Sequence, residues 1–154
     1  PGAIGINAQS LHHQPHEMPN GNYLALTANA QEIENYYTSE TDPDASRANQ
    51  KVVGDKIVEF TPQGEIVWDW NIFDHLDIWR FGYLLTEVYW HTRGFPGHYD
   101  WTHGNGVTYD PHDDSVLIYS VIKMRLSKSI RRLKKSFGSL VTTKAGRAHL
   151  KRSF

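Results

Sequence analysis

Two short runs of β-branched and aromatic residues, separated by a turn that contains proline and glycine, constrain the fold of this chain most. Asp55–Phe60 and Glu65–Trp70 are the two runs, and Thr61–Gly64 lies between them. Two such runs on either side of a turn with proline and glycine are typical of a β-hairpin. The sequence therefore predicts two antiparallel strands here.

Further strand signals follow the same pattern of turn and then strand. Tyr23–Thr27 comes after an Asn-Gly turn, and Val107–Tyr109 with Ser115–Ser120 predicts a second hairpin around an Asp-Pro turn. Residues 29–51 are polar, which predicts a surface loop with at most weak local structure. Residues 71–99 are rich in aromatic side chains without a clean period, which predicts a long loop that is helical in part.

These units contain no alternation of strands with helices, which favours an all-β fold of the sandwich, barrel or propeller kind. The repeated turn-plus-strand pattern favours the propeller. Residues 1–121 hold strands for about two four-stranded blades, too few to close a ring. No run of about 18 apolar residues occurs, so no membrane span is predicted. The absence of cysteine excludes disulfides and thiolate metal sites.

Charge divides the chain into two predicted parts, 1–121 and 122–154. The second part carries 11 of the 16 Lys and Arg residues and none of the 17 Asp and Glu residues. A direct reading is a basic tail that binds polyanions such as nucleic acid. One functional hypothesis is therefore a small β-rich binding module with a polyanion-binding tail.

A cluster of histidines near the start of the chain is the first candidate site. His12 and His13 are adjacent, and on an extended backbone adjacent side chains point to opposite faces, so at most one is expected to face a common site. His12 and His16 have a spacing that suits a metal ion on a helix. Pro15 makes a helix unfavourable there, and we predict no metal site.

The stretch Asp100–Pro111 is the second candidate site. His103 by itself reads as a loop histidine that bonds only to its neighbours, but Gly104 and Gly106 permit close backbone approach to a ligand. Asn105 adds an amide donor, and this combination suits an anionic substrate. Packing in the core is the expected role of three tryptophans: Trp68, Trp70 and Trp101.

Taken together, these segments resemble the bacterial arylsulfotransferases that act without the nucleotide sulfate donor PAPS. The resemblance extends over about residues 9–120 and is carried in chain order by His12-His13, Met18–Leu24, Gly54–Glu59, Gly64–Trp70, Asp100–Asn105 and Tyr109–Pro111. It implies a six-bladed propeller, exported to the periplasm. It also implies an enzyme without a cofactor, in which a histidine takes the sulfuryl group from an aryl sulfate and passes it to a phenol.

The resemblance also assigns roles to individual residues. His13, ahead of His12, matches a channel histidine, and His103 matches the histidine of the Asp-Trp-x-His-x-Asn motif. Both are expected to be supporting catalytic groups, and His12 and Asn105 are expected to bind substrate. The family arginine should follow Ser120, where valine stands, and the nucleophilic histidine should lie further downstream. An inactive fragment of a sulfotransferase is therefore the leading hypothesis, with an aryl sulfate donor and a phenolic acceptor as its small-molecule partners.

A shifted reading frame would explain the basic tail. If one nucleotide was deleted at Ser120-Val121, codons exist with which the original frame would encode a different continuation. That continuation has an alternating strand pattern, an Asp-Pro turn, balanced charge and the family arginine. We hypothesise such a frameshift, which codons incompatible with that continuation would rule out. Translated as written, the tail is expected to be disordered or loosely helical and not to bind nucleic acid specifically.

Overall fold

The computed structural model describes residues 3–39, 41–79 and 88–120. The basic tail, the hypothesised frameshift and the position of the family arginine lie outside these residues. The elements are β1 (Leu11–Glu17), β2 (Tyr23–Tyr36), β3 (Ala48–Phe60), β4 (Ile66–Asn71), the 3-10 turn η1 (Ile72–Asp74), the short helix α1 (Val88–Thr92), β5 (Tyr99–Asp100), β6 (Gly104–Asp110) and β7 (Ser115–Ser120).

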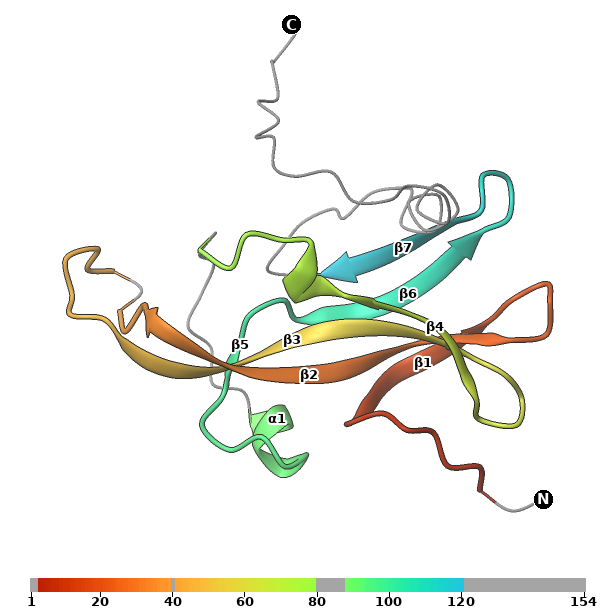
Figure 1. Ribbon diagram of the computed structural model, residues 1–154, viewed down its shortest axis with the longest axis horizontal. Coiled ribbons are helices and arrows are strands. Elements are labelled where there is room, and N and C mark those ends of the chain that lie inside the picture. The colour runs from red at the N-terminus through yellow and green to blue at the C-terminus, as the bar shows by residue number, and fades with distance from the viewer. Residues whose placement is uncertain (1–2, 40, 80–87, 121–154) are drawn as a thin grey trace, which may run out of the picture.

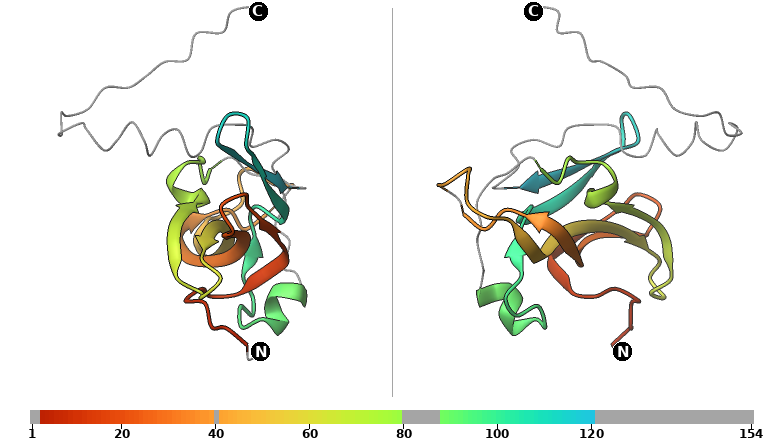
Figure 2. Two further views of the ribbon diagram at one scale, coloured as in Figure 1. Left: turned by 90° about the vertical axis from the view of Figure 1, so that its right-hand side faces the viewer. Right: turned by 60° about the vertical axis from the view of Figure 1, so that its left-hand side comes forward.

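The described residues form two sheets, and the predicted all-β class is confirmed. In the first sheet β1, β2, β3 and β4 pair in that order and antiparallel, and β5 adds to β3 in parallel at Val52 and Val53. The second sheet is the β6–β7 hairpin, which lies on the opposite side of the long β2–β3 pair from α1 (Figures 1 and 2). No barrel is closed by the described strands, and the arrangement is consistent with part of a propeller.

Both predicted hairpins are present. Strands β3 and β4 pair from Lys56 opposite Asn71 to Phe60 opposite Ile66, around the expected turn. Strands β6 and β7 pair from Gly104 opposite Ser120 to Asp110 opposite Ser115. The prediction for the aromatic-rich stretch is confirmed in part, because its described residues include η1 and α1 but also the strand β5.

The prediction of weak structure over residues 29–51 is wrong for most of that range. Strand β2 continues to Tyr36 and β3 begins at Ala48, so only the residues between them form a loop. The sequence did not indicate this extension, because its side chains are mostly polar. The two strands pair there through backbone hydrogen bonds, which do not require apolar side chains. Val52 and Val53 of β3 are fully buried and supply the apolar surface that the polar second half of β2 lacks.

A single core joins the two sheets. Leu24 and Leu26 of β2 and Ile57 of β3 are buried together with Val116 and Ile118 of β7. Burial of apolar side chains from both sheets fixes the β6–β7 hairpin against β1 and β2. The loop that precedes β6 is thereby held beside the start of β1.

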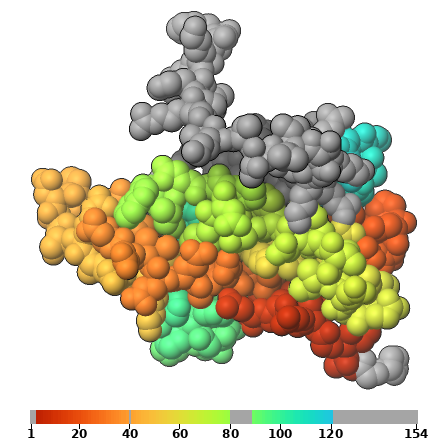
Figure 3. All heavy atoms as spheres, in the orientation of Figure 1, coloured from red at the N-terminus to blue at the C-terminus, as the bar shows by residue number. Residues whose placement is uncertain are grey.

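The segment with α1 is anchored by a smaller cluster. Trp90 packs against Ala28 and Val53, with Tyr89 and Phe95 at its edge. In the space-filling view this segment forms a separate lobe beneath the β2–β3 pair (Figure 3). In the described part of the chain we find no helix with the length and apolar character needed to cross a membrane.

Candidate functional site

The two histidine-containing segments predicted from the sequence meet at one pocket. Its volume is about 130 Å³, and its lining residues come from β1, α1, β5 and the start of β6: His12, His13, Tyr89, Trp90, Asp100, His103, Gly104 and Asn105. We call this the histidine pocket. Sites for whole drug-sized ligands usually occupy about 300–1,000 Å³, so this pocket suits a compact head group.

Both His12 and His13 line this pocket, and the expectation that only one could do so is wrong. The rule of opposite faces assumes regular extended backbone, but His13 has a φ of 57° and the β1–β2 register shifts between His12 and His16. This irregularity turns the chain so that the two rings lie 5.2 Å apart, edge to face. His12 is 4% exposed, whereas His13 is exposed to solvent.

His103 is held by the aspartate three residues before it. Its ring Nδ1 lies 2.6 Å from Oδ2 of Asp100, and its backbone N–H donates to Oδ1 of the same carboxylate at 3.0 Å. The φ of His103 is 44°, a conformation that costs energy in residues with a side chain and often occurs at functional sites. Since Asp100 occupies Nδ1, Nε2 is the ring nitrogen left for a ligand.

Asp55 lies behind the pocket and is 1% exposed. Oδ2 of its carboxylate accepts hydrogen bonds from the Thr102 hydroxyl at 2.5 Å and from the Gly104 backbone N–H at 2.7 Å. Oδ1 lies 3.1 Å from Nε2 of His12. Nothing in the sequence pattern had assigned Asp55 a role beyond the family resemblance.

Gly104 makes a close approach, but to a protein group. A Cβ on Gly104 would lie 2.7 Å from Cγ of Asp55, while one on Gly106 would meet only Cδ2 of Tyr119 at 3.8 Å. The predicted approach to a ligand is thus not what requires glycine at position 104. Asn105 remains exposed at the pocket, with its amide 3.4 Å from the carbonyl oxygen of His103.

An aromatic wall, formed by Tyr89 and Trp90, was missed in the sequence. The Tyr89 ring is stacked near the His13 ring, with 6.5 Å between centroids, and Arg93 lies 3.7 Å above the centroid of Tyr89. Trp90 meets His12 edge to face at 5.0 Å. The density of aromatics was the available signal, but no local pattern shows which rings approach the histidines.

Burial shifts the pKa of two groups in the pocket. The pKa of His13 is lowered from 6.5, first by burial against its neighbours and then by His12, although the Asp55 carboxylate raises it. Burial also raises the pKa of Asp100, and hydrogen bonding to His103 opposes that effect. At neutral pH, His13 therefore favours its uncharged form more than an ordinary histidine does.

A pH titration of the ring protons by NMR checks this assignment. We expect His13 to titrate below 6.5, because burial disfavours its charged form. The unfolded chain then binds more protons than the folded one just below pH 6.5, so the free energy of unfolding should fall as the pH drops through that window. Arg93→Gln should move the midpoint upward, since Arg93 lowers the pKa of His13. A midpoint at or above 6.5 would contradict the assignment.

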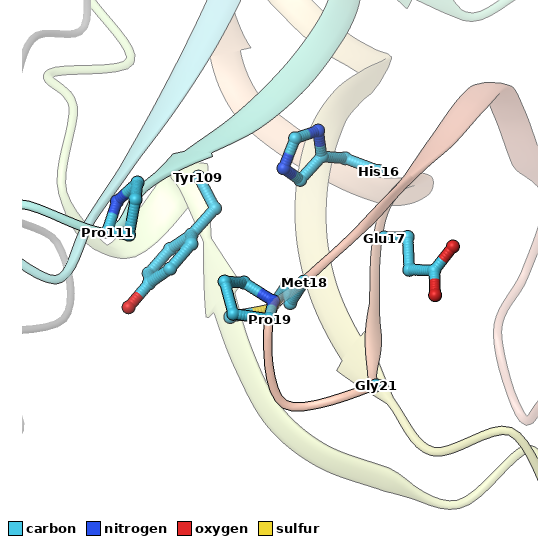
Figure 4. A pocket seen from close by; sticks show the side chains of 7 residues that line it. All are labelled: His16, Glu17, Met18, Pro19, Gly21, Tyr109 and Pro111. Atoms are coloured by element: carbon cyan, nitrogen blue, oxygen red, sulfur yellow. The ribbon is translucent and has the colours of Figure 1, made fainter.

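The structure does not bring the histidines near the start of the chain together with other side chains into a metal site. Among the described residues, no group of three or more His, Asp or Glu side chains is arranged to hold a metal ion. His16 lines a different, more open cavity of about 600 Å³ between the β1–β2 turn and the β6–β7 hairpin. As Figure 4 shows, Met18, Pro19, Tyr109 and Pro111 border that cavity together with His16 and Glu17, and none of the other predicted site residues lies there.

Comparison with protein-family models matches residues 4–123 to the family described as Arylsulfotransferase (ASST). The matched range is well over half of the chain and contains every residue that lines the histidine pocket. Comparisons with curated proteins and with solved structures each gave no match.

Proposed function

This chain belongs to the arylsulfotransferase family, and on that premise we propose that its histidine pocket binds the sulfate group of an aryl sulfate. One observation carries the proposal: His13, His103 and Asn105, predicted from two distant segments, converge on one pocket. Imidazole and amide N–H groups donate hydrogen bonds to anionic oxygens, and such bonds are stronger than those between neutral groups.

Each pocket residue has a role in this proposal. In its protonated form, His103 donates from Nδ1 to Asp100 and from Nε2 to a sulfate oxygen, and the Asn105 amide donates to another oxygen. The rings of Tyr89 and His13 are near-parallel and give the aryl group an apolar surface. His12, which is buried, forms the inner side of the binding pocket.

The proposed reaction passes through a sulfo-histidine. The nucleophilic histidine, which the family resemblance places further downstream and which no residue of this chain matches, attacks sulfur; an N–S bond forms, and the S–O bond to the aryl group breaks. Only the protonated form of His13, the minor form at neutral pH, gives a proton to the departing phenolate oxygen, and the neutral ring then takes one back from the acceptor phenol. The phenol oxygen then forms the new S–O bond as the N–S bond breaks. We propose that the 154-residue chain binds the donor but does not complete this transfer.

Calorimetric titration of the chain with 4-nitrophenyl sulfate tests the binding step. His103→Ala should weaken binding on the order of tenfold, because it removes one hydrogen bond to a charged group. His112→Ala is the matched control, since His112 is exposed in the β6–β7 turn and lies outside the pocket. Equal affinities of the parent chain and both variants, or no binding by the parent chain, would refute the proposal.

The domain arrangement and the compartment follow from the same premise. We propose that residues 1–121 are about two blades of a six-bladed propeller and that residues 122–154 form a separate basic tail. Periplasmic localisation is proposed from the family and is compatible with a chain that has no cysteine to oxidise. Cell fractionation of the expressed protein would test it.

A further inference from the structure

Asp55 is a buried carboxylate that the proposed reaction does not use. A carboxylate without water is strongly unfavourable unless hydrogen bonds or an opposite charge compensate it. Oδ2 has two donors, the Thr102 hydroxyl and the Gly104 N–H. Oδ1 lies 3.1 Å from Nε2 of His12, within ion-pair distance but without hydrogen-bond geometry, and among the described residues neither atom has a hydrogen-bond partner.

The contacts of Asp55 join segments that are far apart in the sequence. His12 lies on β1, Asp55 on β3, and Thr102 and Gly104 flank His103 at the start of β6. The link between β3 and the loop is reciprocal, because the backbone N–H of Asp55 donates to the Thr102 hydroxyl at 2.9 Å. One side chain thus ties both histidine-bearing segments of the pocket to the central strand of the sheet.

We propose that Asp55 is a positioning residue for the arylsulfotransferase site, an inference that rests on the proposed function. The negative charge on Oδ1, 3.1 Å from Nε2 of His12, favours a proton on that nitrogen. Oδ2 fixes the backbone on both sides of His103. The pocket therefore keeps one arrangement of its donors before a sulfate enters, which is the condition for effective stabilisation of a transferring anion.

The tautomer of His12 distinguishes this role from simple packing. In the full chain, the ring nitrogen shifts from long-range ¹⁵N–¹H NMR should identify the Nε2–H tautomer of His12. Asp55→Asn has nearly the same shape but only one acceptor oxygen, which the donors Thr102 and Gly104 require on their side. The amide NH2 then faces Nε2 of His12, and the ring proton should move to Nδ1. The variant should also lower the pKa of His13, since the Asp55 carboxylate raises it.

Thr102→Val is the matched control. It removes one hydrogen bond to Oδ2 but leaves Oδ1 beside His12, so the tautomer should persist. An unchanged tautomer in a folded Asp55→Asn variant would overturn the proposal. If that variant does not fold, the tautomer of the parent chain tests the proposal, because a His12 proton on Nδ1 in the parent chain would also overturn it.

Ligand binding separates this inference from the proposed function. An Asp55→Asn variant that remains folded, as judged by an unchanged far-UV circular dichroism spectrum, should bind 4-nitrophenyl sulfate on the order of tenfold more weakly. Full affinity in the folded variant would overturn the positioning role. A parent chain that binds no aryl sulfate would instead refute the proposed function. The tautomer of His12 would then be the remaining test of whether Asp55 positions the pocket residues.

Discussion

Replacing Trp101 with alanine is expected to lower the free energy of unfolding by about 3–5 kcal/mol, or to leave the chain unfolded. The side chain is 3% exposed and belongs to the core that joins the two sheets. Its ring is stacked on Phe73 with 4.9 Å between centroids and an interplanar angle of 12°. Urea unfolding followed by far-UV circular dichroism measures the loss.

Two variants make this result specific. Val67→Ala, at a side chain that is 49% exposed on β4, should change the free energy of unfolding by no more than about 0.5 kcal/mol. Trp101→Phe should lose less than Trp101→Ala, because a ring remains to stack on Phe73. Equal losses in Trp101→Ala and Val67→Ala would show that Trp101 does not belong to the core.

The position of Trp101 shows how much the sequence could predict. The Asp-Trp-x-His-x-Asn motif contains both kinds of residue: Trp101 lies in the core, and Asp100, His103 and Asn105 line the pocket. Packing was the expected role of Trp101 and Trp70, and both are buried. The hairpins were predictable for a similar reason, since the turn chemistry and the strand period are local properties.

Other features of the site depend on tertiary structure and leave no local signal. The left-handed backbone at His13 brings two adjacent histidines to one pocket, although a regular strand would separate them. Tyr89 reaches the pocket only because Trp90 anchors its segment on Ala28 and Val53. Asp55 reads as an ordinary polar residue of a strand until its partners from the β6 loop are in place.

Replacing Gly104 with alanine is expected to lower the free energy of unfolding by about 1–3 kcal/mol. The new Cβ would lie 2.7–2.8 Å from three atoms of the Asp55 carboxylate. That carboxylate cannot easily move away, because Thr102 bonds to it and it is fully buried beside His12. The backbone at Gly104 has no positive φ, so the cost is steric and does not arise from the loss of glycine's freedom.

Gly106→Ala, two residues along the same strand, separates this steric effect from a general intolerance of the loop. Its Cβ would meet only the exposed Tyr119 ring at 3.8 Å, an ordinary contact, so stability should be unchanged or slightly higher. Thermal unfolding of both variants gives the comparison. If Gly104→Ala is as stable as Gly106→Ala, the Asp55 carboxylate does not sit against position 104. The contact through which Asp55 is proposed to position His103 would then be absent.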